Sequence, residues 1–209
     1  MKTRIITISR EFGSGGRTVA KRVAEELQIP YYDKALVKQV AVETGFDEKY
    51  IEQEGEHAPV KSMLAYAFAA RGTQGVMNGM SANDFLWVIQ RKVILDLAEK
   101  GPCIIVGRCA DYILKDRDDC LNVFVHAPMA QRADRIVRLY GESEQTPEKR
   151  LTDKDKRRSV YYKNYTGQDW GRTQNYHLSL DSGKLGIENC VKIIVGLVQS
   201  GEETEQPRG

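Results

Sequence analysis

A glycine-rich run near the N-terminus has the residue types of a phosphate-binding loop. Residues Arg10 to Thr18 read REFGSGGRT and follow the β-branched run IITIS. Such a loop needs glycines that let successive amides point at phosphate oxygens, a helix N-terminus beneath them, and a hydroxyl placed for magnesium. Against the pattern G-x-x-x-x-G-K-[ST], Gly16 and Thr18 match, whereas Glu11 replaces the first glycine and Arg17 replaces the lysine.

Another interpretation of this run stays open. A glycine-rich turn between a strand and a helix can be a plain tight connection, because glycine tolerates the backbone angles that such turns require. A dinucleotide-binding fingerprint would need G-x-G-x-x-G. Gly13, Gly15 and Thr18 do not satisfy that pattern, since its third glycine is a threonine here.

A basic segment in the last third of the chain is the second chemical candidate. Residues Lys149 to Arg172 include eight basic and three acidic side chains, although the formal net charge of the whole chain is only +2. On a helix, four of these cations fall at i, i+4, i+7 and i+8 and form one stripe: Arg150, Lys154, Arg157 and Arg158. A solvated face is one alternative. Nucleic-acid binding, with Tyr161, Tyr162 and Tyr165 to stack on bases, is disfavoured by the near-neutral total charge.

The elements that must position these residues alternate along the chain. Strand-like runs occur at Arg4–Ser9, Ile29–Tyr32, Cys103–Val106, Leu121–His126 and His177–Leu180. Helical periodicity follows at Val19–Leu27, Ala35–Val42, Phe85–Leu97 and Ile187–Val198, and Thr146-Pro147 opens a further helix. Five strands alternating with helices predict an α/β domain with a parallel sheet covered on both faces. Ligands of such sheets bind beyond the carboxyl ends of the strands.

Length and composition narrow the class of protein. A chain of 209 residues is long enough for one domain with a sizeable core. Its longest apolar runs fall far short of the ~20 residues of a membrane span, and no long apolar stretch follows the N-terminus as a secretory signal requires. The cysteines form no C-x-x-C pair: Cys103, Cys109, Cys120 and Cys190. We therefore expect reduced, mostly buried thiols in a cytoplasmic protein without a zinc site.

Four stretches together resemble the cytidylate kinase-like family, a branch of the P-loop nucleoside monophosphate kinases. They are ITISREFGSGGRTVAKRVAEELQIPYYDKALV, CIIVGRCADYIL, KDKRRSVYYKNYTG and YHLSLDSG. The resemblance covers most of the chain except Phe46 to Met80. It implies a three-layer P-loop kinase fold: a five-stranded parallel sheet with helices on both faces, a helical acceptor-binding insertion and a mobile lid.

The same resemblance divides the chain. It implies a single kinase domain over residues 1–200, with a core of residues 1–32, 84–145 and 176–200. Residues 33–83 are then the acceptor-binding segment and residues 146–175 the lid. We expect the polar residues 201–209 to form a disordered tail.

Site residues follow from the matching positions. The phosphates of ATP would be held by Gly13, Ser14, Gly15, Gly16, Arg17 and Thr18, with Thr18 also a magnesium ligand. Arg17, Lys156 and Arg157 would be the catalytic cations, the last two from a segment that resembles the family's lid motif R-D-R-R-D-S. The acceptor would be bound by Asp33, Lys38, Arg108 and Asp111. Two of these carry structural alternatives: Asp33 as a helix N-cap, which could coincide with ligand binding, and Arg108 in a surface ion pair.

Several residues depart from the family's pattern at these positions, among them Lys154 and Lys156, which replace two arginines of the lid motif. Cys109 stands where the family has Asp after Gly-Arg, Lys34 stands where it has a small residue, and Arg158 replaces the second Asp of the lid motif. The departures at Cys109 and Lys34 concern the acceptor site.

The resemblance predicts ATP-dependent phosphoryl transfer to a nucleoside monophosphate, CMP or dCMP. A phosphate acceptor is already anionic at neutral pH, so no general base is required. Nucleotides are the expected partners, with neither nucleic acid nor membrane. Two alternatives remain: a non-catalytic or regulatory nucleotide-binding protein, favoured by Arg17, and a kinase of another small metabolite, favoured by Cys109 and Lys34.

Overall fold

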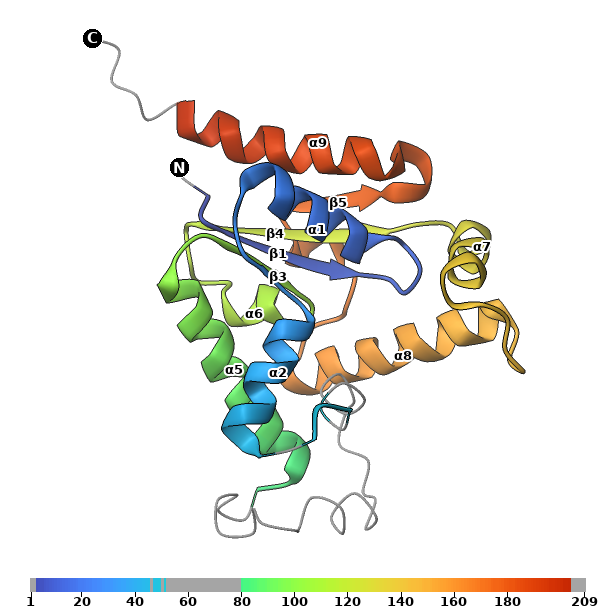
Figure 1. Ribbon diagram of the computed structural model, residues 1–209, viewed down its shortest axis with the longest axis horizontal. Helices are drawn as coiled ribbons and strands as arrows, with labels where there is room; N and C mark the ends of the chain where they lie inside the picture. The colour runs from blue at the N-terminus through green and yellow to red at the C-terminus, as the bar shows by residue number, and fades with distance from the viewer. Residues whose placement is uncertain (1–2, 46, 50, 52–79, 204–209) are drawn as a thin grey trace.

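A five-stranded parallel sheet forms the middle layer of the structure (Figure 1). The computed structural model describes residues 3–45, 47–49, 51 and 80–203. The strand order is β2-β3-β1-β4-β5, and all neighbours are parallel. The strands are β1 Ile5–Arg10, β2 Tyr31–Tyr32, β3 Cys103–Val106, β4 Cys120–His126 and β5 Leu178–Asp181. The predicted parallel sheet is confirmed, with small shifts at the strand ends.

Helices cover both faces of the sheet, as Figure 1 shows. The helices α1 (Gly16–Leu27) and α9 (Ser182–Glu203) pack on one face, and α2 (Lys34–Thr44) and α5 (Ala82–Lys100) lie on the other. Alternate side chains of β1 enter the two cores: Ile5 packs with α2 and α5, whereas Ile6 and Ile8 pack with α1 and α9. This period of two explains why an almost continuous apolar run forms a strand buried on both sides.

Capping chemistry explains three helix ends, of which the start at Thr146-Pro147 was predicted. The Ser81 hydroxyl caps α5 by accepting the amide of Asp84 at 3.1 Å, and it donates to the Asp84 carboxylate at 2.6 Å. The helix α8 (Pro147–Thr166) begins with proline after the capping residue Thr146. The helix α2 ends at Gly45, whose φ of 70° is in the left-handed region.

Three elements and one boundary differ from the sequence-based expectations. No prediction covered α6 (Ala110–Ile113), α7 (Met129–Tyr140) or the 3-10 helix η1 (Thr173–Asn175). The tail predicted to start at residue 201 is wrong at its beginning, because α9 continues to Glu203. Val195 and Val198 anchor this helix on the core, and the polar residues that follow extend its backbone hydrogen bonds. Residues 204–209 lie outside the described part, as do residues 46, 50 and 52–79 of the predicted acceptor-binding segment.

The cysteines are free and buried, as expected. Burial raises the pKa of Cys103 to about 11 and that of Cys120 to about 12, so both thiols stay protonated at neutral pH. Over the residues that the structure describes, no helix combines the length and apolar character needed to cross a membrane.

Candidate active site

The phosphate loop, residues 11–16, connects β1 to α1. Gly13 and Gly15 have φ of +80° and +83°, angles that L-residues with a side chain rarely adopt. Gly15 is the N-cap of α1, so this helix begins with no capping side chain, and its first turn carries no acidic residue. The first amides of α1 are therefore not used by a cap within the described structure, which suits an anion.

The three loop glycines also lie close to their neighbours. A Cβ on Gly13 would be 2.9 Å from the carbonyl oxygen of Arg132. A Cβ on Gly15 would be 2.5 Å from Nη1 of Arg135, and one on Gly16 would be 2.5 Å from the side chain that ends β1. The loop is therefore packed closely against α7 and the end of β1, a fit that both the plain-turn interpretation and a phosphate loop allow.

A pocket lies between the phosphate loop and α7, and we call it the loop pocket. Its lining includes Gly13, Gly15, Thr18, Arg135, Tyr140 and Arg158. Thr18 is exposed there, so its hydroxyl is accessible. Arg17 also lines the pocket, but its guanidinium is already paired with Asp33: Nε lies 2.8 Å from Oδ2 and Nη2 donates to Oδ1 at 3.3 Å. The loop cation is thus held toward the second strand.

A second pocket opens at the carboxyl ends of β1 and β3, and we call it the sheet-edge pocket. Its lining includes Ser9, Arg10, Arg108, Arg158, Tyr162 and Trp170. Arg10 and Arg158 line both pockets, so the two sites meet at these arginines. This is the edge of a parallel sheet where ligands are expected.

Arg108 is a buried residue of the sheet-edge pocket. Only 8% of it is exposed, and its Nη1 donates to the carbonyl of Ile51 at 3.2 Å and to Oε1 of Gln90 at 3.3 Å. The alternative of a surface ion pair is wrong, because the side chain points inward. Arg108 and Cys109 both have positive φ, 57° and 55°, directly after Gly107. Such strained backbone is frequent at binding sites.

Asp111 lies behind the lining of the same pocket. Its Oδ1 accepts from the Ser9 hydroxyl at 3.2 Å, and its Oδ2 accepts from the Tyr162 hydroxyl at 2.7 Å. Burial raises the pKa of Asp111, although these hydrogen bonds act in the opposite direction. The structure therefore brings Asp111 to the pocket through Ser9 and Tyr162, which separate it from the lumen.

Asp33 and Lys38 belong to the predicted acceptor-binding segment. Asp33 occupies the N-cap position of α2, yet its side chain makes no capping hydrogen bond within the described structure. It pairs with Arg17 and accepts from the Tyr31 hydroxyl at 3.2 Å. The N-cap alternative is therefore correct in position but not in hydrogen bonding. Lys38 is exposed on α2.

The predicted lid cations lie on α8. Lys156 and Arg157 are exposed, whereas the neighbouring Arg158 reaches the site. The Nη1 atom of Arg158 donates to the carbonyl of Arg10 at 3.3 Å. The departure from the family's lid motif thus supplies one of the two arginines that line both pockets.

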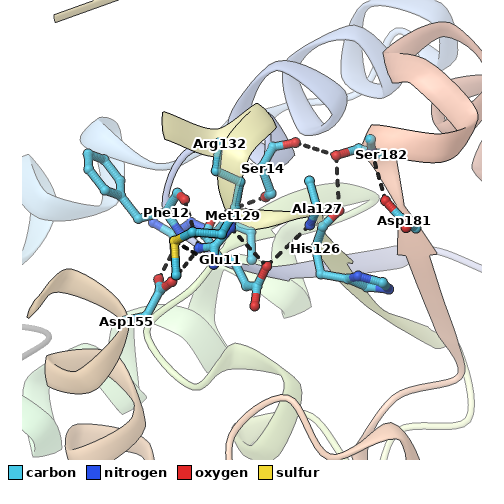
Figure 2. A network of polar contacts seen from close by, with 12 residues as sticks. Glu11, Phe12, Ser14, His126, Ala127, Met129, Arg132, Asp155, Asp181 and Ser182 are labelled. Carbon is cyan, nitrogen blue, oxygen red and sulfur yellow. Dashed lines mark hydrogen bonds and ion pairs between the residues drawn. The ribbon is translucent and has the colours of Figure 1, made fainter. Parts of the chain in front are cut away.

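Sequence reasoning missed several residues that hold the loop, and Figure 2 shows them together. Glu11, the residue in place of the first glycine, accepts the amide of Ala127 at 3.2 Å and lies 3.3 Å from Nε of Arg132. Asp155 of α8 pairs with Arg132 from the other side. The signal for α7 was present, because Ala133 and Ile136 are apolar at helical spacing and both are buried.

Comparison with known proteins identifies the family of the chain. The model of the cytidylate kinase-like family matches residues 5–184. The chain belongs to the cytidylate kinase-like family. A cytidylate kinase of Aeropyrum pernix is 26% identical over 189 residues, which cover 90% of this chain and 95% of that protein. A cytidylate kinase of Methanopyrus kandleri is 24% identical over 212 residues, which cover 97% of each.

Solved structures agree on the fold of this family member. An uncharacterised protein from Eubacterium ventriosum has a TM-score of 0.70 at 27% identity, covering 95% of this chain and 99% of that one. Shikimate kinase from Acinetobacter baumannii, solved in complex with shikimate, has a TM-score of 0.55 at 15% identity, covering 96% and 95%. The second likeness concerns the fold alone. The architecture is the P-loop kinase fold, as predicted.

Proposed function

We propose that the protein transfers the γ-phosphoryl group of ATP to a nucleoside monophosphate, with CMP or dCMP as the acceptor. The observation that carries this proposal is the meeting of two pockets at Arg10 and Arg158, one of them walled by the phosphate loop. The family match and the relatives named cytidylate kinase support the choice of acceptor. Its partners in this proposal are nucleotides, and its place of action is the cytoplasm.

The loop pocket suits the triphosphate of ATP. The uncapped start of α1 offers amides, and the loop glycines line the pocket. Thr18 would hold magnesium through its accessible hydroxyl, and Arg135 adds positive charge. Arg17 would add its charge on release from Asp33. Magnesium, when bound, would neutralise phosphate charge during transfer.

The sheet-edge pocket suits the acceptor phosphate. Arg108 lines this pocket, is buried and has a strained backbone with positive φ. Its guanidinium can bind a phosphate through two parallel hydrogen bonds. Since a monophosphate dianion is itself the nucleophile, the protein needs only to align two repelling anions and compensate their charge. Arg10 and Arg158 are placed between the two pockets for that task.

Lys156 and Arg157 would act when the lid closes. Both are exposed on α8 and are not among the residues that line the two described pockets, so contact with phosphates requires their side chains to turn toward the bound nucleotide. Closure would also exclude water, which otherwise competes as an acceptor and turns a kinase into an ATPase.

A kinase of another small metabolite is the second candidate, favoured by two observations. Cys109 lines the pocket where the family has a carboxylate, and Asp111 is a buried carboxylate behind the lining. An alcohol acceptor needs a general base, which a phosphate acceptor does not. A non-catalytic nucleotide-binding protein is favoured by the Arg17–Asp33 pair, which holds the loop cation away from the phosphates.

A panel of acceptors separates these functions. ATP consumption is measured with CMP, dCMP, UMP, AMP, GMP, shikimate and gluconate, with Thr18→Ala as the inactive control and Thr18→Ser as the control that keeps the hydroxyl. We expect turnover with CMP or dCMP and little without an acceptor. Turnover with only a sugar or another alcohol would refute the proposed acceptor, and ATP binding without turnover on any of them would indicate a non-catalytic role.

A further inference from the structure

The carboxylate of Asp155 on α8 contacts the main chain of the phosphate loop (Figure 2). Its Oδ1 accepts the amide N–H of Phe12 at 2.7 Å. Its Oδ2 lies 2.5 Å from Nη1 of Arg132, which also donates to the carbonyl oxygen of Phe12 at 3.2 Å. Both main-chain polar groups of one loop residue are therefore held by side chains from α7 and α8.

The Phe12 side chain is held by the same two helices. It packs against the small cluster formed by Ala133 and Ile136 of α7 and Leu151 of α8. Ile136 and Leu151 are fully buried, so this cluster is a fixed support. The lid helix thus contacts the phosphate loop through both a hydrogen bond and apolar packing.

The charges around this contact compensate one another. Arg132, whose side chain is only 6% exposed, lies between the carboxylates of Glu11 and Asp155. Two partly buried carboxylates beside a phosphate site would oppose anion binding if they were unpaired. With Arg132 and Arg158 as counter-charges, the set is neutral and the loop can accept an anion.

Asp155 also faces Arg158, one helical turn further along α8. Its Oδ1 lies 3.5 Å from Nη1 of Arg158, and that same nitrogen donates to the carbonyl of Arg10 at 3.3 Å. Arg158 is the side chain that reaches both pockets from α8. One carboxylate oxygen is therefore shared between the loop amide and the arginine at the boundary of the two pockets.

We propose that Asp155 is a positioning residue that holds the phosphate loop and Arg158 in register with each other. Asp155 acts on the loop pocket through the Phe12 amide. It acts on the place where the loop pocket meets the sheet-edge pocket through Arg158. The proposal rests on the proposed function only in naming ATP as the ligand of the loop. It predicts that the hydrogen-bond acceptor at position 155, and not just the charge there, supports nucleotide binding.

Two substitutions separate hydrogen bonding from charge. Asp155→Ala and Asp155→Asn both remove the negative charge, but only asparagine keeps an oxygen that can accept the Phe12 amide. A pure charge effect would make both variants bind ATP more tightly, since a nearby anion is lost. We expect Asp155→Ala to bind ATP about tenfold more weakly than Asp155→Asn, the factor that one such hydrogen bond provides. Asp153→Asn, the same change on the same helix, is the matched control.

Hydrogen exchange of the nucleotide-free protein tests the contact directly. The amide of Phe12 should exchange at least about tenfold faster in Asp155→Ala than in the wild type, and close to the wild-type rate in Asp155→Asn. If Asp155 were only a stabilising residue, melting temperature would fall in the variants while the ATP dissociation constant of the folded protein stayed unchanged.

The outcomes also separate this inference from the proposed function. An unchanged Phe12 exchange rate in Asp155→Ala, or equal ATP affinity in the alanine and asparagine variants, overturns the inference whatever the acceptor is. Wild-type protein that turns over no acceptor would refute the proposed function, and the exchange measurement would still decide the role of Asp155 because it needs no nucleotide. Once an acceptor is identified, Asp155→Asn should lower kcat about tenfold, because Arg158 loses the negative charge beside it.

Discussion

Gly13→Ala is the sharpest test of how the phosphate loop is built. The new methyl group would lie 2.9 Å from the main-chain oxygen of Arg132 and 2.9 Å from Cγ2 of the buried Ile136. Neither neighbour can rotate away, because one is backbone of α7 and the other belongs to a packed cluster. Overpacking of this kind costs roughly 1–3 kcal/mol. A φ of +80° adds the cost of a left-handed residue, roughly 1–2 kcal/mol.

A matched control isolates the steric part. Gly167, the C-cap of α8, has a φ of +70°, and a Cβ added there would meet nothing within 4 Å, so Gly167→Ala carries the backbone cost alone. Urea denaturation should therefore show Gly13→Ala to be less stable than Gly167→Ala by roughly 1–3 kcal/mol. ATP binding should weaken in the first variant and not in the second, since only the first displaces the loop. Equal losses of stability would refute the close packing of the loop against α7.

Four further outcomes are expected. Thr18→Ala should lower magnesium-dependent turnover by about a hundredfold with no change in melting temperature, because the hydroxyl is exposed, and Thr18→Ser should restore most of it. Arg108→Ala should raise the KM of the acceptor far more than the KM of ATP; equal effects would indicate a structural role through its buried hydrogen bonds. Arg157→Ala should lower kcat and kcat/KM together by roughly ten- to a hundredfold, because a lid contact forms only in the closed state. Weakened polynucleotide binding with intact turnover would instead indicate a nucleic-acid site. Burial raises the folded pKa of Asp111 above its unfolded value of about 4, so this group's contribution to stability is lost as pH rises through the folded pKa. Urea denaturation should therefore show that the free energy of unfolding of the wild type falls between pH 4 and pH 7, relative to that of Asp111→Asn. An identical pH dependence of the two proteins would contradict a buried Asp111 carboxyl with a raised pKa.

The sheet and its helices were predictable because their signals are local. The β-branched run of β1, the capping box before α5 and the proline at the start of α8 each depend on residues next to one another in the chain. The two apolar faces of β1 follow from the alternation of its side chains. These patterns are independent of what packs on them, so the sequence alone was sufficient.

The charge pairs of the site could not be predicted in this way. Arg17 is adjacent to the phosphate loop, but its partner Asp33 is brought to it only by the βαβ crossover that returns the chain to the sheet. Asp155 and Phe12 are 143 positions apart in the sequence. The inward direction of Arg158, compared with the exposed Arg157, depends on the rotation of α8 about its axis, which the packing of Leu151 and Tyr162 fixes.

The departures from the P-loop pattern support one another in the structure. Glu11 adds a negative charge where the pattern has glycine, and the cation of Arg132 lies beside it. Arg158 adds a positive charge where the lid motif has Asp, and the carboxylate of Asp155 lies beside it. Arg132 then joins the two carboxylates, so the four charges form one compensated set across the loop, α7 and α8. Removing Arg132 would take away the cation that Glu11 and Asp155 share, and leaving partly buried carboxylates without that cation costs more than the pairs contribute. Glu11 and Arg158 are therefore better understood as parts of one alternative way to hold the loop than as separate losses from the standard one.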